Sequence, residues 1–471
     1  MTAFSTTEDL EVAVAEASLS ETLTALHALG PALGLAKFAA SLDPEWIDAA
    51  LQATGTASIR RRKCPADRVI WTILGASLFA DRSIDEVARD FGVEFPGVQS
   101  LAKSAVTQAR YRVGPEPLRW LFQKVADTWK DSPGLGGYKS LTLYGIDGTH
   151  LRVPDSQANS DHFGRPGGRA GSGDSGYPQA RVVVLLNLSN RIIAGAEIGR
   201  LKEGELGLSV PLSDDITDNS LTIVDRGFNS YPWIHEITKN GSNRHAMVRA
   251  KKNLKFRIDD ILEDGTALAA LEPRSEILSE YPGIAAEIPI RVIEYRYPDS
   301  KETTRLFVTL LDAKKYPAKE LIALYHQRWE LEIAFDELKT HMLERKECLR
   351  SQKPEGIMQE IWAQLLTYNL VRREMLLVAN EKKVSANRVS FRTSLLYIRD
   401  FWLVAGMTRA PGNIPKNLAF LEKDLTRLIL PERRSDRRYP RHVKIKMSNY
   451  PRNRGRSKPA ETPEKWEESA K

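Results

Sequence analysis

Three carboxylates stand where a sheet and a helix could bring them together. Asp147 follows the β-type run SLTLYGI, and Asp225 follows the buried-looking run NSLTIV. In open α/β sheets, side chains at the carboxyl ends of strands face the crevice that holds the site. Glu332 comes from a predicted helix further along the chain. Carboxylate oxygens are hard ligands, so this set suits two Mg²⁺ ions and phosphoryl chemistry, in which one ion activates the nucleophile and the other stabilises the leaving oxygen.

The helix that carries Glu332 is predicted over residues 321–343. At 100° per residue, four polar or aromatic residues share a strip roughly 60° wide, and five apolar residues form a seam beside it. The strip is Tyr325, Arg328, Glu332 and Lys339, and the seam is Leu324, Leu331, Phe335, Leu338 and Met342. Glu330 and Glu337 point roughly 160° and roughly 140° away from Glu332, so Glu332 is the glutamate expected to reach a site. Taken alone, the pattern also fits a solvated surface helix.

Composition places the chain among globular proteins of a reducing compartment. Its 471 residues allow two or three domains, and 42% of them are hydrophobic and 27% charged. No apolar run reaches the roughly 18 residues of a membrane span, and the acidic N-terminus lacks the features of a signal peptide. Cys64 and Cys348 are the only cysteines, which argues against a disulfide framework and a cysteine-based zinc site. We therefore expect a cytoplasmic protein with no membrane partner.

The positive charge of the chain is concentrated near its C-terminus. Between Pro431 and Lys458, eleven Lys and Arg residues stand against two acids, a net charge of +9. Since the whole chain carries +7, the remainder carries −2. Tyr439 and Tyr450 interrupt this stretch, and aromatic residues among cations suit a nucleic-acid strand. We expect residues 431–471 to be a basic tail that binds nucleic acid, although such a block can also serve only as a solubilising tail.

The patterns divide the rest of the chain into helical and β-type parts. After an N-terminal tail at 1–30, residues 31–135 read as helical, and residues 252–312 are mostly β-type. Within the first part, a glycine-containing turn leads to a basic helix with Lys103, Arg110 and Arg112. This arrangement resembles a helix-turn-helix whose second helix enters a major groove, and a plain helical bundle is the alternative. Arg181 to Leu188 and Arg191 to Ile198 predict a β-hairpin.

The spacing along the 321–343 helix resembles a family signature. Tyr325, Arg328, Glu332 and Lys339 match, at every interval, the Y-(2)-R-(3)-E-(6)-K signature of the insertion-sequence-four family of DDE transposases. The stretches DGTHLRVPD and DRGF, which begin at Asp147 and Asp225, resemble the two aspartate motifs of that family. The run IRRRKCPADRVIWTILGASLF resembles its N-terminal domain, and YPRHVKIKMSNYPRNR resembles its basic tail.

This resemblance implies an α/β fold with a ribonuclease-H-like catalytic core over residues 138–380. The mostly β subdomain at about 252–312 would be inserted between the second aspartate and the glutamate. A helical DNA-binding domain at 31–135 would precede the core, and C-terminal helices at 381–430 and the basic tail would follow it.

The resemblance further implies metal-dependent cut-and-paste transposition of an insertion sequence. Asp147, Asp225 and Glu332 would bind two Mg²⁺ ions, for which Mn²⁺ can substitute. Water would hydrolyse one strand at the element end, and the freed 3′-hydroxyl would attack the target, or first the opposite strand to form a hairpin. The phosphate contacts would be Tyr325, Arg328 and Lys339. The implied partners are double-stranded DNA, as terminal inverted repeats and target, and a second copy in a homodimeric synaptic complex at the bacterial nucleoid.

In some members of the family an inserted tryptophan stacks on a flipped base. The 252–312 region contains no Trp, so Tyr295, Tyr297 or Phe307 would take that role here. A nuclease that cleaves without joining would use the same residues. A catalytically silent DNA-binding protein derived from a transposase is a further alternative, against which the intact set of three carboxylates argues. His150, His326 and Asp336 are expected to be bystanders of the site.

Overall fold

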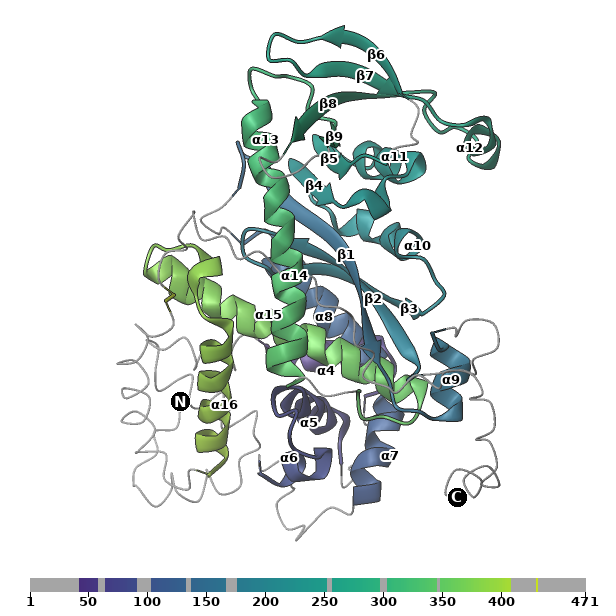
Figure 1. Cartoon of the computed structure of the whole chain (residues 1–471). Helices are drawn as coiled ribbons and strands as arrows, with labels where there is room; N and C mark the ends of the chain where they lie inside the picture. The colour runs from purple at the N-terminus through teal and green to yellow at the C-terminus, as the bar shows by residue number, and fades with distance from the viewer. Residues whose placement is uncertain are drawn as a thin grey trace, which may run out of the picture.

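The structure, a computed structural model, describes residues 42–57, 64–90, 103–132, 137–166, 176–251, 256–296, 303–344, 348–407 and 429–430. The expected N-terminal and basic tails and Tyr297 lie outside these residues. The described chain is a mixed α/β protein in which helices cover one large sheet (Figure 1). None of its described helices is long and apolar enough to cross a membrane.

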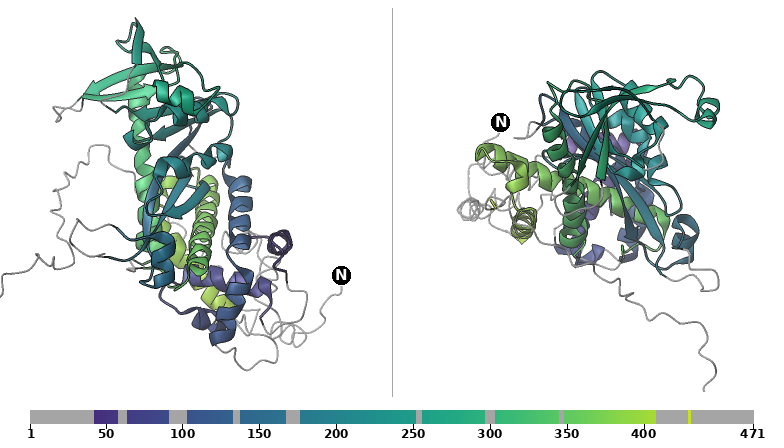
Figure 2. Two further views of the ribbon diagram at one scale, coloured as in Figure 1. Left: turned by 90° about the vertical axis from the view of Figure 1, so that its right-hand side faces the viewer. Right: turned by 45° about the horizontal axis from the view of Figure 1, so that its top comes forward.

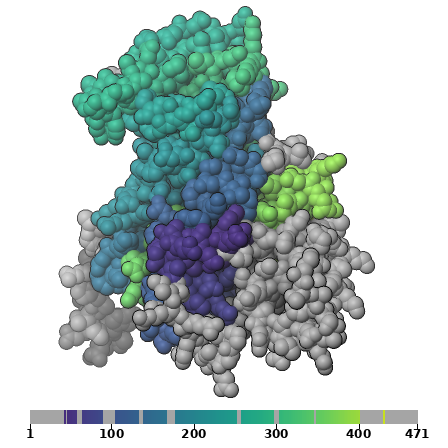
Figure 3. Space-filling view, turned by 180° about the vertical axis from the view of Figure 1, so that it is seen from behind, coloured from purple at the N-terminus to yellow at the C-terminus, as the bar shows by residue number. Residues whose placement is uncertain are grey.

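The N-terminal region is helical, as its sequence predicts. Its described helices are α4 (Pro44–Ala53), α5 (Ala66–Leu78), α6 (Ile84–Asp90), α7 (Lys103–Val113) and α8 (Glu116–Trp129). Asp43 caps α4, because its carboxylate accepts a hydrogen bond of 2.9 Å from the Glu45 N–H. Ser83 and Glu86 form a reciprocal capping box before α6, in which the Ser83 N–H donates to Glu86 Oε2 at 2.6 Å. In the space-filling view from behind, the purple surface of the first of these helices lies below the teal surface of the middle of the chain (Figure 3).

One nine-stranded sheet organises the described chain, in the order β3-β2-β1-β4-β5-β9-β8-β7-β6. Its strands are β1 (Thr142–Arg152), β2 (Gln179–Asn187), β3 (Ile193–Arg200), β4 (Ser220–Val224), β5 (Arg244–Arg249), β6 (Phe256–Ile261), β7 (Ala267–Leu271), β8 (Ile288–Arg296) and β9 (Thr303–Val308). β1, β4 and β5 run parallel, and the other neighbours pair antiparallel. The predicted hairpin is confirmed as β2 and β3, with Val182 opposite Ile198.

Strand β1 corrects one expectation. The sequence predicted a β-type run that ends at Ile146, whereas β1 continues through Asp147 to Arg152. The reason lies in its neighbours: β2 pairs with β1 along this whole length, with Asp147 opposite Val184, while the parallel neighbour β4 ends at Val224. Asp147 therefore stands in mid-strand, at the level where the strand beside it stops.

The β-type region near 252–312 extends the main sheet. β9 pairs antiparallel with β5, with Val248 opposite Phe307, and β8, β7 and β6 continue outward to the sheet edge. Helix α12 (Ser275–Glu280) projects from this part, which lies at the top of Figure 1. The prediction of a β-rich segment between Asp225 and Glu332 therefore agrees with the strands found there.

Alternating side chains of β2 feed two cores on opposite faces of the sheet. Val182, Val184 and Leu186 join the larger core, which contains the long helix α15 (Pro354–Glu381). Val183 and Leu185 join a second core under α11 (Tyr231–Lys239). In Figure 2, α15 runs between the strands and α8. Further helices are α9 (Gln157–Phe163), α10 (Glu205–Ser209) and α16 (Phe391–Met407).

The helix predicted over 321–343 is a chain of four helical segments rather than one regular α-helix. They are α13 (Ala318–Tyr325), the 3₁₀ turn η3 (His326–Arg328), α14 (Trp329–Asp336) and the π-helical η4 (Glu337–Met342). A 3₁₀ turn is wound more tightly and a π segment more loosely than an α-helix. The 100° spacing therefore holds only within α14, and the strip from Tyr325 to Lys339 is not straight.

Candidate active site

Asp147 and Asp225 lie side by side on neighbouring parallel strands. Their strands pair Gly145 with Ile223, and the same register carried two residues further places Asp147 level with Asp225. Asp225 is the first residue after β4, where its carboxylate accepts a 2.6 Å hydrogen bond from the Gly227 N–H. Burial, together with the negative charge of Asp225, raises the pKa of Asp147 to about 6.

Arg328 joins this pair to the helical segments at 318–342, which carry Glu332 and together are termed the catalytic helix. Its Nη2 donates to Glu332 Oε1 at 3.1 Å, and its Nη1 lies 4.0 Å from Asp147 Oδ2. The three side chains are partly exposed, with 18% for Arg328, 25% for Asp147 and 37% for Glu332, so they open toward solvent. The Arg328 guanidinium thus lies between Glu332 and Asp147, at the level where β4 ends and Asp225 begins.

The donor set fits a hard divalent cation. Two adjacent carboxylates, one of them with a raised pKa, leave negative charge that Mg²⁺ or Mn²⁺ would offset through oxygen ligands. Within the part of the chain that the structure describes, no three His, Cys, Asp or Glu side chains lie close enough to hold a metal ion. The Glu332 carboxylate is paired with Arg328 instead.

The other two residues of the predicted strip occupy different surroundings. Lys339 lies half-buried in the π segment, where burial lowers the pKa of its ammonium. No carboxylate of the described residues lies within 4.0 Å of its Nζ, so its charge is not used by an internal ion pair. Tyr325 is 9% exposed and belongs to the larger core, so its aromatic ring helps to pack the helix.

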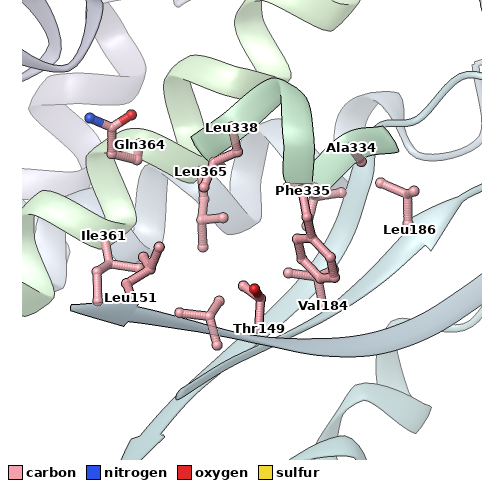
Figure 4. Close-up of a pocket in the computed structure, with 12 residues that line it drawn as sticks. Thr149, Leu151, Val184, Leu186, Ala334, Phe335, Leu338, Ile361, Gln364 and Leu365 are labelled. Atoms are coloured by element: carbon pink, nitrogen blue, oxygen red, sulfur yellow. The ribbon is translucent and has the colours of Figure 1, made fainter. Parts of the chain in front are cut away.

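A close approach at one glycine seats the catalytic helix on β1. A Cβ added at Gly145 would stand 2.8 Å from Leu331 Cδ1, a distance that packed side chains do not reach. Below this point Phe335 and Leu338 line one pocket with Thr149 and Val184 of the sheet, and Figure 4 shows the Phe335 ring above Val184. The predicted apolar seam is therefore confirmed at these positions, and it holds Glu332 near Asp147.

Sequence reasoning missed two residues beside Asp147. The Glu205 carboxyl group lies over Gly148, where an added Cβ would meet its Cγ at 2.6 Å, and it pairs with Arg181 at 3.0 Å. Arg181 is the direct register partner of His150 across β1 and β2. Only the pairing of β1 with β2 and the turn before α10 bring these residues together. Gly148 is thus needed for a close contact in the middle of β1.

Trp329 is a third residue that the sequence did not single out. It follows Arg328 directly and is 44% exposed, which is unusual for so large an apolar side chain. An exposed indole beside a DNA site can stack on an unpaired base. Of the residues expected in that role, Phe307 is 2% exposed and packs on Phe256 with ring centroids 5.3 Å apart, and Tyr295 is half-buried. Burial makes Phe307 unsuitable, so that expectation is wrong for this residue.

The helix-turn-helix expectation also needs correction at Arg110. Arg110 turns inward, where its Nε donates to Gln359 Oε1 at 2.9 Å and its Nη2 lies 3.7 Å from Glu360. Arg112 donates to the Cys64 carbonyl at 3.4 Å. Arg110 therefore joins α7 to α15 and is not displayed to a major groove, whereas the Arg112 side chain is exposed and the expectation for it stays a prediction. Of Lys103 the structure describes only the backbone.

The contacts of His150, Asp336 and His326 agree with the expectation that they are bystanders of the site. Burial, with the charges of Arg181 and Lys339, lowers the pKa of His150, which favours the neutral ring. Asp336 accepts a 2.7 Å hydrogen bond from the Thr340 hydroxyl, and His326 is exposed. None of these contacts makes the three residues part of the carboxylate group.

Comparison with known proteins adds an independent finding. Residues 33–123 match the family described as "Insertion element 4 transposase N-terminal", and residues 140–370 match the "Transposase DDE domain". The chain is 32% identical over 414 residues to "Transposase InsG for insertion sequence element IS4" from Escherichia coli (strain K12), covering 87% of this chain and 92% of that protein.

Among solved structures, the chain is similar to a piggyBac transposase in a synaptic complex with hairpin DNA. The TM-score is 0.40 at 12% identity, with 83% of this chain and 82% of that chain covered. This similarity is too weak to support a fold or a function. The family follows from the sequence matches, and the relative position of Asp147 and Asp225 follows from the register of β1 and β4.

Proposed function

The chain belongs to the insertion element 4 family of DDE transposases, and on that premise we propose that it cuts and pastes its insertion sequence by metal-dependent phosphoryl transfer. Membership of the family already makes it a protein of DNA transposition. The proposal adds the mechanism and the residues. One observation carries it: parallel register places Asp147 level with Asp225, and Arg328 ties Glu332 to the same place.

We propose that the catalytic core is ribonuclease-H-like. The strand order β3-β2-β1-β4-β5, with an antiparallel meander followed by parallel strands, supports this assignment. Strands β6 to β9 would then be the insertion between the second aspartate and the glutamate. Helices α4 to α8 would form the N-terminal DNA-binding domain, without the Arg110 contact that the sequence suggested.

Asp147, Asp225 and Glu332 would hold the metal ions in this proposal. When bound, two Mg²⁺ ions activate the attacking oxygen and stabilise the leaving oxygen of an in-line displacement. Glu332 must then exchange its contact with Arg328 for a place beside the aspartates. Arg328 would gain a DNA phosphate as its new partner, since a guanidinium binds phosphate with two parallel hydrogen bonds.

The reaction consists of two kinds of displacement at phosphorus. In the first, a water oxygen attacks at the element end, the bond from phosphorus to the 3′-oxygen breaks, and that oxygen leaves as a 3′-hydroxyl. In the second, this 3′-hydroxyl attacks a target phosphodiester, loses its proton, and displaces the 3′-oxygen of the target strand. Attack on the opposite strand would instead close a hairpin.

Lys339 and Arg328 would hold the DNA backbone during both displacements. The ammonium of Lys339 has no internal carboxylate partner among the described residues and is half-buried, which favours a phosphate as its counter-charge. Tyr325 would contribute chiefly by packing, with at most its hydroxyl reaching a phosphate. We propose that two copies, one at each inverted repeat, form the synaptic complex.

The test is cleavage of the protein's own DNA end. A labelled duplex carrying the inverted repeat that flanks the gene is incubated with Mg²⁺ or Mn²⁺ and target plasmid, and products are separated on a denaturing gel. We expect nicked ends and joined products, both lost in Asp147→Asn, Asp225→Asn and Glu332→Gln, while end binding in Ca²⁺ persists. Nicks without joined products would identify a nuclease. Full cleavage by any of these variants would overturn the site.

A further inference from the structure

The back of the catalytic helix carries an ion cluster that the mechanism does not use. It consists of Arg191, Glu330, Glu337, Tyr368 and Arg372. We infer that this buried ion cluster sets the rotation of the catalytic helix about its own axis, so that Glu337 and Tyr368 are positioning residues for Glu332 and Lys339. The inference rests on the proposed function, because it assigns a role to groups that act through the proposed metal and phosphate ligands.

Arg191 binds the helix from the turn between β2 and β3. Its Nε donates to Glu330 Oε2 at 2.5 Å, and its Nη1 donates to Glu337 Oε1 at 2.7 Å. The residue is 2% exposed and has a φ of 57°, a left-handed conformation that non-glycine residues adopt at a cost. Arg191 thus adopts an unfavourable backbone conformation and buries its guanidinium, and in this position it binds two carboxylates of one helix.

Two residues of helix α15 bind Glu337 from the other side. Arg372, which is fully buried, pairs with Glu337 through its Nη2. The Tyr368 hydroxyl donates to Glu337 Oε2 at 3.0 Å and accepts from Arg372 Nε at 3.1 Å. Each oxygen of Glu337 is therefore bound to a different arginine from a different element, and the cluster contains two cations and two anions.

These contacts resist rotation in a way that the apolar seam does not. Apolar contacts are non-directional, so a helix can turn on its seam with little change in buried area. Charge-assisted hydrogen bonds require direction, and inside the protein no water can replace a broken one. Glu330 stands roughly 160° from Glu332 within α14, and Glu337 follows α14 directly as the first residue of η4. A rotation that moves Glu332 away from Asp147 therefore pulls Glu330 and Glu337 away from their partners in the cluster.

Glu337 is also the first residue of the π segment that contains Lys339. A π segment inside a longer helix changes the direction of the side chains that follow it, and such segments occur often at functional sites. By fixing the residue where the wider winding begins, the cluster fixes the direction of Lys339. Glu337 thus fixes the direction of Glu332, the proposed metal ligand before it in the helix, and of Lys339, the proposed phosphate contact after it.

The experiment compares two buried tyrosines that each lose one hydroxyl. Tyr368→Phe removes two hydrogen bonds of the cluster, and Tyr144→Phe is the matched control. Tyr144 is equally buried, with its hydroxyl 3.3 Å from Asp131 and 3.1 Å from Thr217, on the other face of the sheet. Glu337→Gln is a second variant, which keeps the shape but removes the charge. Mn²⁺ affinity is measured by electron paramagnetic resonance, with melting temperature and single-turnover cleavage of the end duplex.

Groups that support a metal site through its ligands commonly change its affinity by 10- to 100-fold. We therefore expect Tyr368→Phe to weaken Mn²⁺ binding and to slow cleavage by about tenfold, while Tyr144→Phe leaves both unchanged at a similar loss of melting temperature. If Tyr368→Phe behaves like the control, the inference is wrong. Should Glu337→Gln fail to fold, Tyr368→Phe still decides.

A further variant distinguishes failure of the proposed metal site from failure of the positioning role. Asp147→Asn should weaken Mn²⁺ binding strongly if the proposed site is correct. If it does so while Tyr368→Phe has no effect, the positioning role falls and the proposed function stands. If Asp147→Asn leaves Mn²⁺ affinity unchanged, the proposed metal site fails and the positioning role fails with it.

Discussion

Replacing Gly145 with alanine should disturb the seat of the catalytic helix on β1. The added Cβ would stand 2.8 Å from Leu331 Cδ1, 3.2 Å from Leu331 Cγ and 3.0 Å from Leu188 Cδ2. Both leucines are buried, with 0% and 1% exposure, so neither has free space to move into. Gly145 and Asp147 are two residues apart and face the same side of the strand. A helix that is pushed away from Gly145 therefore also moves away from Asp147.

Two magnitudes follow from this geometry. Overpacking of a tight core costs about 1–3 kcal/mol, which urea unfolding should show as a lower free energy of unfolding. A misplacement of about 1 Å at a reacting centre costs about 100-fold in rate, so a shift of several tenths of an ångström should slow single-turnover cleavage about tenfold. Binding of the DNA end in Ca²⁺ should change little, because the phosphate contacts remain.

Two further variants make the reasoning refutable. Leu331→Ala should partly rescue the stability of Gly145→Ala, with a coupling free energy of about 1 kcal/mol, since the two side chains compete for one space. Gly207→Ala is the control, because an added Cβ there meets nothing within 4 Å. Wild-type cleavage by Gly145→Ala, or strictly additive effects of the two substitutions, would refute the idea that this contact positions the helix.

Three other predictions concern stability and DNA binding. Arg350→Ala should lower the free energy of unfolding by about 3 kcal/mol in a urea titration, because its guanidinium donates to the Ala76, Phe79, Ala80 and Arg82 carbonyls at the end of α5; an unchanged midpoint would contradict this. Burial raises the pKa of Asp215 from 3.8 to about 6, so the folded state binds the proton more tightly and loses stability as pH rises from about 4 to 6. Asp215→Asn should therefore stabilise the protein by up to about 3 kcal/mol at pH 7 and by little at pH 4, and an equal effect at both values would refute the assignment. Lys339→Gln should weaken end binding and lower the slope of log affinity against log salt by about one, whereas an unchanged slope would remove Lys339 from the phosphate contacts.

Local patterns predicted the elements of this protein well. The Asp43 cap and the Ser83–Glu86 capping box are local hydrogen bonds, whose partners lie within three residues. The β2–β3 hairpin and α15 follow from runs whose periodicity is visible in a short window. Helix geometry alone predicted that Glu330 and Glu337 point away from Glu332. Both residues pair with Arg191, which agrees with that prediction.

Positions that depend on neighbours could not be predicted. β1 continues through Asp147 because β2 remains paired with it, and no local signal distinguishes that outcome from a turn at Asp-Gly. Arg110 looked like a DNA contact because a basic residue on a helix has no visible partner in sequence. Its partners, Gln359 and Glu360, are about 250 residues away. The contact of Glu205 with Gly148 likewise depends on how α10 folds over β1.

The sequence by itself determined the family and which residues we propose for the chemistry, because the spacing along one helix and the motifs after two strands can be read without any knowledge of contacts. Only the tertiary structure decided that Asp147 and Asp225 are level, since that is a property of register between strands 78 residues apart. It also decided that Glu332 is paired with Arg328 and that Glu337 is gripped from two elements. Direction and burial of charged groups arise from packing, and packing couples residues that local pattern treats as independent.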